Sequence, residues 1–91
     1  MREFDYIIKD MQGLHARPAT LLVKIANEYK STVVIFANEK QANCSSIFQI
    51  LKLAAKQGQN VKIRIEGEDE DDAYERLLSF CCSEIWFDIS L

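Results

Sequence analysis

The sequence has 91 residues, 48% of them hydrophobic and 27% charged, which is typical of a globular protein rather than a disordered chain. At this length we expect one compact domain over residues 1–91, folding without disulfides or metal. The net charge of −3 argues against nucleic-acid binding, and the lack of a long apolar run or a signal-peptide pattern argues against membrane insertion and predicts a cytoplasmic protein.

The first strand is expected over residues 4–9, where aromatic and β-branched residues occur, and residues 10–13 end it. A helix is expected over residues 16–29, because apolar residues recur there at intervals of three and four. Pro18 is compatible with this helix because it lies in the first turn. The apolar positions that predict the helix are Ala19, Leu22, Val23 and Ala26.

A hairpin and a short helix follow. The β-branched run over residues 32–36 predicts a strand, and a tight turn at residues 38–39 leads into a shorter strand over residues 41–43. Ser46 then stands where an N-cap residue is expected, before a helix over residues 47–55.

The last strand and helix have the clearest patterns. Apolar and charged residues alternate over residues 61–65, which predicts a half-buried strand. Acidic residues 68–72 suit the N-terminus of a final helix, which we expect to run to about Glu84. Its buried stripe is predicted to be Ala73, Leu77, Phe80 and Cys81.

These elements occur in the order β-α-β-β-α-β-α, with no internal repeat or linker. Separated strands with amphipathic helices predict an α+β open-faced sandwich, a four-stranded antiparallel sheet with three helices on one face. The three cysteines, Cys44, Cys81 and Cys82, lack the C-x-x-C spacing of metal or redox motifs. We therefore expect reduced thiols and no metal site, a reactive or metal-binding cysteine being the alternative.

His15 is the only histidine and stands at the start of the first predicted helix. Unpaired N–H groups and the positive end of the helix dipole suit a phosphate there, and Arg17 can add a charge-assisted hydrogen bond. We expect a neutral, nucleophilic imidazole at this position, as phosphoryl acceptance requires, and a phosphorylated imidazole retains a good leaving group for onward transfer. The alternative is that His15 only caps the helix and Arg17 is a solvated charge.

Three segments resemble the HPr family, the histidine phosphocarriers of the bacterial phosphoenolpyruvate-dependent sugar phosphotransferase system. They are residues 13–19 (GLHARPA), residues 46–48 (SIF) followed by Leu53, and residues 66–70 (EGEDE). The likeness extends from about residue 2 to about residue 84. The family fold that it implies has the element order derived above.

The resemblance implies that Nδ1 of His15 accepts a phosphoryl group from enzyme I and passes it to IIA proteins. Ala16, Arg17 and Pro18 would surround the phosphate. The chain would then be a phosphoryl carrier rather than a stand-alone enzyme. It would use no cofactor and would act as a monomer.

Enzyme I and the IIA proteins would dock on an apolar patch beside the histidine. In the helix over residues 47–55, we expect Ile50, Leu53 and Ala54 to face the sheet, which leaves the other apolar residues outside. The alternative is that the outer residues, Leu51 above all, belong to the core. The implied patch consists of Ala16, Thr20, Leu21, Ile47, Phe48 and Leu51, with Lys24 at its rim.

Ser46 matches the serine that an ATP-dependent HPr kinase/phosphorylase modifies in many Gram-positive members. A phosphate there would place negative charge inside the patch, and the alternative is a plain N-cap serine. The second function considered is a regulatory binding module of the same fold, possessing a His15 that is not phosphorylated in use. Its patch would bind a transcriptional regulator or an enzyme.

Several residues depart from the family pattern. Glu39 replaces the glycine usual in the hairpin turn, Ser45 replaces a lysine, and Gln49 and Ala54 stand where glycine is frequent. These differences indicate a divergent member or a paralogue that serves a different enzyme I, and they weaken the prediction for Ser46. The apolar segment over residues 85–91 lies outside the resemblance, and we expect it to pack on the sheet, form a dimer contact or anchor a partner.

Overall fold

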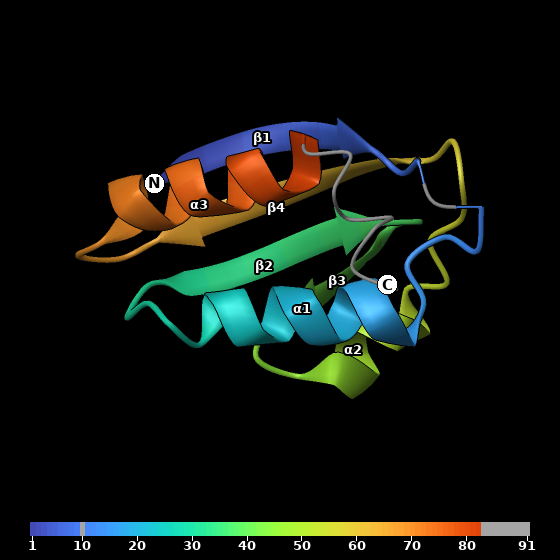
Figure 1. Cartoon of the computed structure of the whole chain (residues 1–91), viewed down its shortest axis with the longest axis horizontal. Helices are drawn as coiled ribbons and strands as arrows, with labels where there is room; N and C mark the ends of the chain where they lie inside the picture. The colour runs from blue at the N-terminus through green and yellow to red at the C-terminus, as the bar shows by residue number, and fades with distance from the viewer. Residues whose placement is uncertain (10, 83–91) are drawn as a thin grey trace.

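The computed structural model describes residues 1–9 and 11–82, and of Cys82 it describes the backbone only. Within this part of the chain the helices and strands follow the predicted order (Figure 1). They are β1 (Arg2–Ile7), α1 (Ala16–Ala26), β2 (Thr32–Ala37), β3 (Lys40–Asn43), α2 (Ile47–Lys52), β4 (Asn60–Glu66) and α3 (Glu70–Cys82).

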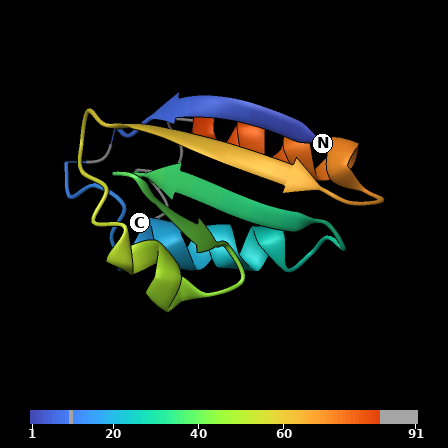
Figure 2. The same cartoon turned by 180° about the vertical axis from the view of Figure 1, so that it is seen from behind.

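The four strands form one antiparallel sheet in the order β1-β4-β2-β3. Ile63 of β4 lies at its centre, paired with Phe4 on one side and Ile35 on the other. The helices α1 and α3 cover one face, and α2 lies beside α1 near β3, while the view from behind shows the opposite face uncovered (Figure 2). The predicted open-faced sandwich is confirmed.

The core lies between the sheet and the helices. Val61, Ile63 and Ile65 are all buried, as the alternation in β4 predicts. The stripe predicted for α3 is buried throughout. In α1 the residues Ala19, Leu22 and Ala26 are buried as predicted, and Val23 is half-buried at the edge of the core.

Three elements have boundaries that were predicted wrongly. β1 begins at Arg2 and ends at Ile7, because its register with β4 runs from the pair Arg2–Ile65 to the pair Ile7–Asn60. The helix α1 ends at Ala26 rather than Tyr29. The chain turns over residues 27–30, and Lys30 and Ser31 are then hydrogen-bonded to Asp69, far away in the sequence.

The helix α2 ends at Lys52 rather than at residue 55. Ala54 adopts the left-handed conformation, with φ of +53°, which a helix cannot contain. Its side chain is exposed instead of facing the sheet, so that prediction was wrong, whereas Ile50 and Leu53 are buried as expected. The predictions for Glu84 and for residues 85–91 lie outside the described residues.

Two departures from the family pattern have a measurable expected effect on stability. Glu39 and Ala54 have φ of +63° and +53°, a region that glycine occupies without strain. Glu39→Gly and Ala54→Gly are each expected to raise the free energy of unfolding by about 1 kcal/mol in urea titrations, the relief of strain exceeding the added chain entropy. Lys56→Gly, at a neighbouring exposed position with negative φ, should lower it; a similar loss in all three variants would contradict the assignment of strain.

Asp69 joins the start of α3 to the segment between α1 and β2. Its Oδ1 accepts hydrogen bonds from the Ser31 N–H at 2.9 Å and from the Ser31 hydroxyl at 2.5 Å, and its Oδ2 accepts one from the Lys30 N–H at 2.8 Å. The Ser31 hydroxyl is the largest cause that lowers the pKa of this carboxyl, followed by the Lys30 N–H.

This lowered pKa predicts a pH dependence of stability. The contribution of Asp69 is full above the unfolded-state pKa of about 4 and is lost as the pH falls through the lower pKa of the folded state. Urea unfolding of the unmodified chain and of Asp69→Asn should therefore differ most near neutral pH, and the difference should shrink below about pH 4. A difference that stays constant from neutral to acidic pH would show that ionisation of Asp69 plays no part.

None of the helices in the described residues has the length and apolar character needed to cross a bilayer.

Candidate functional site

His15 occupies the N-cap position of α1. Its backbone is extended, with φ of −88° and ψ of −171°, and its carbonyl oxygen accepts the Ala19 N–H at 3.0 Å. The imidazole, which is half-buried, makes no capping hydrogen bond. The alternative that this side chain serves as a helix cap is therefore not supported.

The loop before His15 rests closely on the chain between α2 and β4. Gly13 is buried, with φ of +72°, and a Cβ atom built on it would lie 2.4 Å from the Ala55 carbonyl oxygen and 2.9 Å from the Lys56 Cα. The next N–H, that of Leu14, donates to the same Ala55 oxygen at 2.9 Å. Only glycine allows this approach, which sets where His15 enters the helix.

The first turn of α1 presents hydrogen-bond donors at the histidine. Ala19 is the first residue whose N–H is bonded within the helix, so the N–H groups of Ala16 and Arg17 have no partner inside the helix. Pro18 is buried and has no N–H, so it cannot donate a backbone hydrogen bond to a phosphate. Of the role expected for it at the phosphate, shaping the start of the helix is what is left. Two backbone donors and the positive end of the helix dipole therefore lie beside His15.

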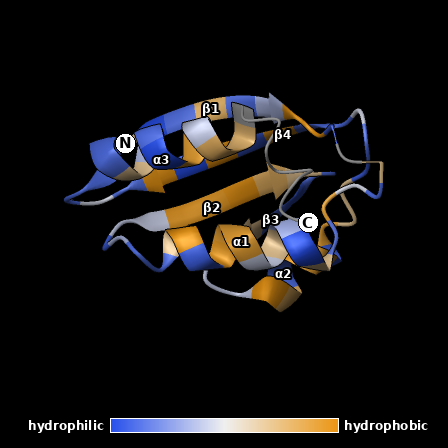
Figure 3. Cartoon of the chain, in the orientation of Figure 1, coloured by the Kyte–Doolittle hydropathy of each residue, from blue (hydrophilic) through white to orange (hydrophobic). Residues whose placement is uncertain are grey.

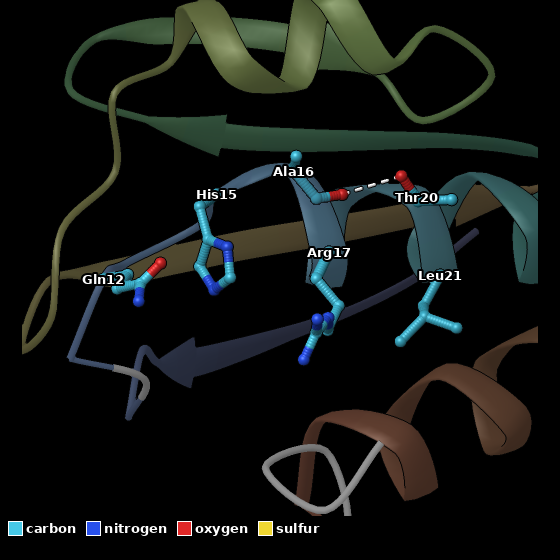
Figure 4. A pocket seen from close by; sticks show the side chains of 6 residues that line it. All are labelled: Gln12, His15, Ala16, Arg17, Thr20 and Leu21. Atoms are coloured by element: carbon cyan, nitrogen blue, oxygen red, sulfur yellow. Dashed lines mark hydrogen bonds between the residues drawn. The ribbon is translucent and has the colours of Figure 1, made fainter. Parts of the chain in front are cut away.

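His15 and Arg17 project to the same side of the chain (Figure 4). The Arg17 side chain is exposed, as expected for a cation that meets a ligand from solution. Thr20 is also exposed, and its hydroxyl donates to the Ala16 carbonyl oxygen at 2.7 Å (Figure 4). A shallow hollow is lined by Gln12, His15, Ala16, Arg17, Thr20 and Leu21.

Gln12 is the lining residue that sequence reasoning missed. It belongs to the turn before the helix, where neither periodicity nor a capping pattern indicates a direction for its side chain. In Figure 4 its carboxamide lies on the side of His15 away from Arg17. The sequence offered one indication for Gln12, namely that it directly precedes the motif at residues 13–19.

The apolar residues of α2 lie where they were predicted. The Phe48 side chain is 75% exposed and that of Leu51 is 37% exposed, so Leu51 does not belong to the core. Ile47 is half-buried, and Ile50 lies beneath them in the core. Coloured by hydropathy, α2 is an apolar helix beside the more polar start of α1 (Figure 3). The two helices pack together, and on α1 Ala16, Thr20 and Lys24 are exposed while Leu21 is half-buried.

Ser46 caps α2 as predicted. Its hydroxyl oxygen accepts the Gln49 N–H at 3.4 Å, and the residue is half-buried. Gln49 in turn accepts the Asn43 N–H through Oε1 at 2.9 Å. The amide at residue 49, where the family often has glycine, thus joins the cap to the end of β3.

Cys44 and Cys81 are buried and reduced, as expected. Burial raises the pKa of the Cys44 thiol to about 12, which keeps it protonated and unreactive at neutral pH.

The comparisons with known proteins match most of the chain. The family model described as the PTS HPr component phosphorylation site matches residues 2–82. The phosphocarrier protein HPr of Mycoplasma capricolum subsp. capricolum is 43% identical over 77 residues, which are 85% of this chain and 86% of that protein.

Solved structures agree with the sequence matches. The crystal structure of HPr-C-His from Thermoanaerobacter tengcongensis has a TM-score of 0.86 at 38% identity, covering 97% of both chains. Crh, a Bacillus subtilis catabolite repression protein solved as an intertwined dimer with a swapped domain, has a TM-score of 0.70 at 34% identity. The match covers 89% of this chain and 93% of Crh.

Proposed function

This chain belongs to the HPr family of phosphocarrier proteins, and from that membership we propose that His15 accepts a phosphoryl group from phospho-enzyme I and passes it to a IIA protein. The observation that carries the proposal is the position of His15. A histidine that makes no capping bond stands at the N-terminus of α1, next to two backbone donors and an exposed guanidinium.

In the transfer step, the lone pair of His15 Nδ1 attacks the phosphorus of the phosphoryl group on enzyme I. The new N–P bond forms as the bond between phosphorus and the donor group of enzyme I breaks, and the bonding electrons leave with that donor group. The N–H groups of Ala16 and Arg17 and the Arg17 guanidinium stabilise the negative charge on the phosphoryl oxygens. Onward transfer to a IIA protein is the same step with His15 as the leaving group.

The shape of the site fits transfer between proteins. The hollow at His15 is shallow and open, so a small substrate would not be enclosed there. A second protein can approach His15 directly. The neighbouring apolar side chains of α2 supply a surface on which it can dock.

The test is transfer in two stages. The chain is first phosphorylated with enzyme I, magnesium and phosphoenolpyruvate, then separated and mixed with a IIA domain. We expect one acid-labile phosphoryl group by intact mass, absent in His15→Ala, and its appearance on the IIA domain. A phosphorylated chain that keeps its label in the presence of active IIA domains would overturn the carrier function.

The docking surface has its own prediction. Phe48→Ala should raise the KM for phospho-enzyme I about tenfold, because an exposed aromatic side chain is the strongest candidate for an interface hot spot. Thermal unfolding should change little, since the side chain is 75% exposed. The control is Ile7→Ala, which removes a 49% exposed apolar side chain from β1. Equal KM values for both variants would exclude α2 from docking.

A second function is favoured by the similarity to Crh. The chain would act as a regulatory module, with Ser46 phosphorylated by an ATP-dependent HPr kinase/phosphorylase and the patch presented to a transcriptional regulator. Incubation with such a kinase and ATP should place one acid-stable phosphate on the chain, lost in Ser46→Ala. A chain that stays unlabelled while another HPr is phosphorylated in the same reaction would eliminate this regulation.

A further inference from the structure

We call residues 11–14, which lead into His15, the histidine loop, and residues 53–59, between α2 and β4, the support loop. The histidine loop rests on the support loop. Its Ala55 carbonyl oxygen accepts the Leu14 N–H at 2.9 Å, directly before His15. Its Gly58 N–H donates to the Ile8 carbonyl oxygen at 2.9 Å, just beyond β1. The place of the histidine loop therefore depends on the place of the support loop.

Two carboxamides tie the support loop to the hairpin turn between β2 and β3. Asn38, in that turn, donates from Nδ2 to the Leu53 carbonyl oxygen at 2.9 Å. Gln59 donates from Nε2 to Asn38 Oδ1 at 2.9 Å, and its Oε1 accepts the Lys56 N–H at 2.7 Å. The pair thus holds both ends of the support loop from one point. The hairpin turn, the support loop and the histidine loop gather at the same end of the sheet in Figure 1.

The support loop needs such bonds because it contains no regular secondary structure. The helix α2 ends at Lys52, and Ala54 is held in the left-handed region. A strained residue of this kind persists only where the surrounding contacts determine the conformation. The bonds from Asn38 and Gln59 are the side-chain contacts that the described residues show on this stretch of backbone.

We propose that Asn38 and Gln59 are positioning residues for His15. Their amide pair holds the support loop, the loop holds Leu14 through Ala55, and Leu14 sets how His15 enters α1. The catalytic consequence rests on the proposed function, while the positional claim does not. Displacement of a reacting group by about 1 Å can slow a reaction about 100-fold, so a loosened support should slow phosphoryl acceptance about tenfold.

The experiment uses two variants and one matched control. Asn38→Gly removes the carboxamide while keeping a residue that tolerates the positive φ of 53°, and Gln59→Ala removes its partner. Gln41→Ala removes an exposed carboxamide from the adjacent strand β3. Two quantities are measured: hydrogen exchange of the Leu14 N–H, and steady-state phosphorylation by enzyme I.

In both test variants, Leu14 exchange should rise about tenfold and kcat should fall about tenfold, with KM changing by less than about twofold. In the double variant kcat should fall no further than in either single variant, because the two residues act as a unit. Gln41→Ala should match the unmodified chain in both measurements.

The proposal is overturned if folded Asn38→Gly shows unchanged Leu14 exchange and unchanged kcat. A lower free energy of unfolding with unchanged kcat would also overturn the proposal, because Asn38 and Gln59 would then have a structural role only. If the unmodified chain accepts no phosphoryl group, the proposed function fails. The Leu14 exchange and the ring-proton chemical shifts of His15 then still decide whether the pair positions the histidine.

Discussion

Replacing Arg17 by alanine is expected to slow phosphoryl acceptance by His15 about 100-fold, the effect found when one preorganised donor to a developing charge is removed. The exposed guanidinium projects to the same side as the imidazole, beside the N–H groups of the first turn (Figure 4). Because the guanidinium meets the phosphoryl oxygens only as the group passes to His15, the loss should fall on kcat rather than on KM.

The measurement is rapid-quench phosphorylation by phospho-enzyme I. Arg17→Lys keeps a positive charge without the planar fork of donors and should recover only part of the rate. Arg76→Ala, which removes an exposed guanidinium from α3, is the matched control and should behave like the unmodified chain. Equal rates for Arg17→Ala and Arg76→Ala would return Arg17 to the role of a solvated surface charge.

Gly13→Ala is expected to lower the free energy of unfolding by about 3 kcal/mol, the largest stability effect that we predict. The new methyl group would lie 2.4 Å from the Ala55 carbonyl oxygen, which itself holds the Leu14 N–H. Backbone atoms cannot move aside as a flexible side chain can. The histidine loop should therefore detach from its support, and phosphoryl acceptance should slow as well.

Gly58→Ala separates steric contact from backbone strain. Gly58 also has positive φ, +87°, but a Cβ atom there meets nothing within 4 Å. Gly58→Ala should lower the free energy of unfolding, measured in urea, by about 1 kcal/mol, because of the left-handed conformation alone. If the two variants lose the same stability, the close approach of Gly13 to Ala55 contributes nothing.

The parts of the fold that follow from local pattern were predictable from the sequence. The alternation of apolar and charged residues around Ile63 predicts a strand with one buried face. The hydroxyl of Ser46 ahead of an apolar run predicts the start of a helix. The placement of His15 and Arg17 at a helix start was also predictable, because the histidine, the arginine and the helix start are contiguous in the chain.

What escaped prediction depends on contacts between distant residues. The segment that follows α1 is held by Asp69, which binds the backbone at Ser31 from 38 residues away. The early end of α2 depends on Ala54, whose left-handed backbone carries no sequence signal because alanine normally favours helix. The same holds for Asn38 and the loop that supports the histidine, since polar residues outside regular elements have no periodicity to read.

The proposed carrier function depends above all on where the phosphoryl group is attached. The most direct measurement is nitrogen and phosphorus NMR of the chain after reaction with enzyme I, magnesium and phosphoenolpyruvate, with another HPr phosphorylated in parallel as a control. We predict one phosphoryl group, bonded to Nδ1 of His15. A group on any other residue, or an unmodified His15 beside a fully phosphorylated control protein, would contradict the account.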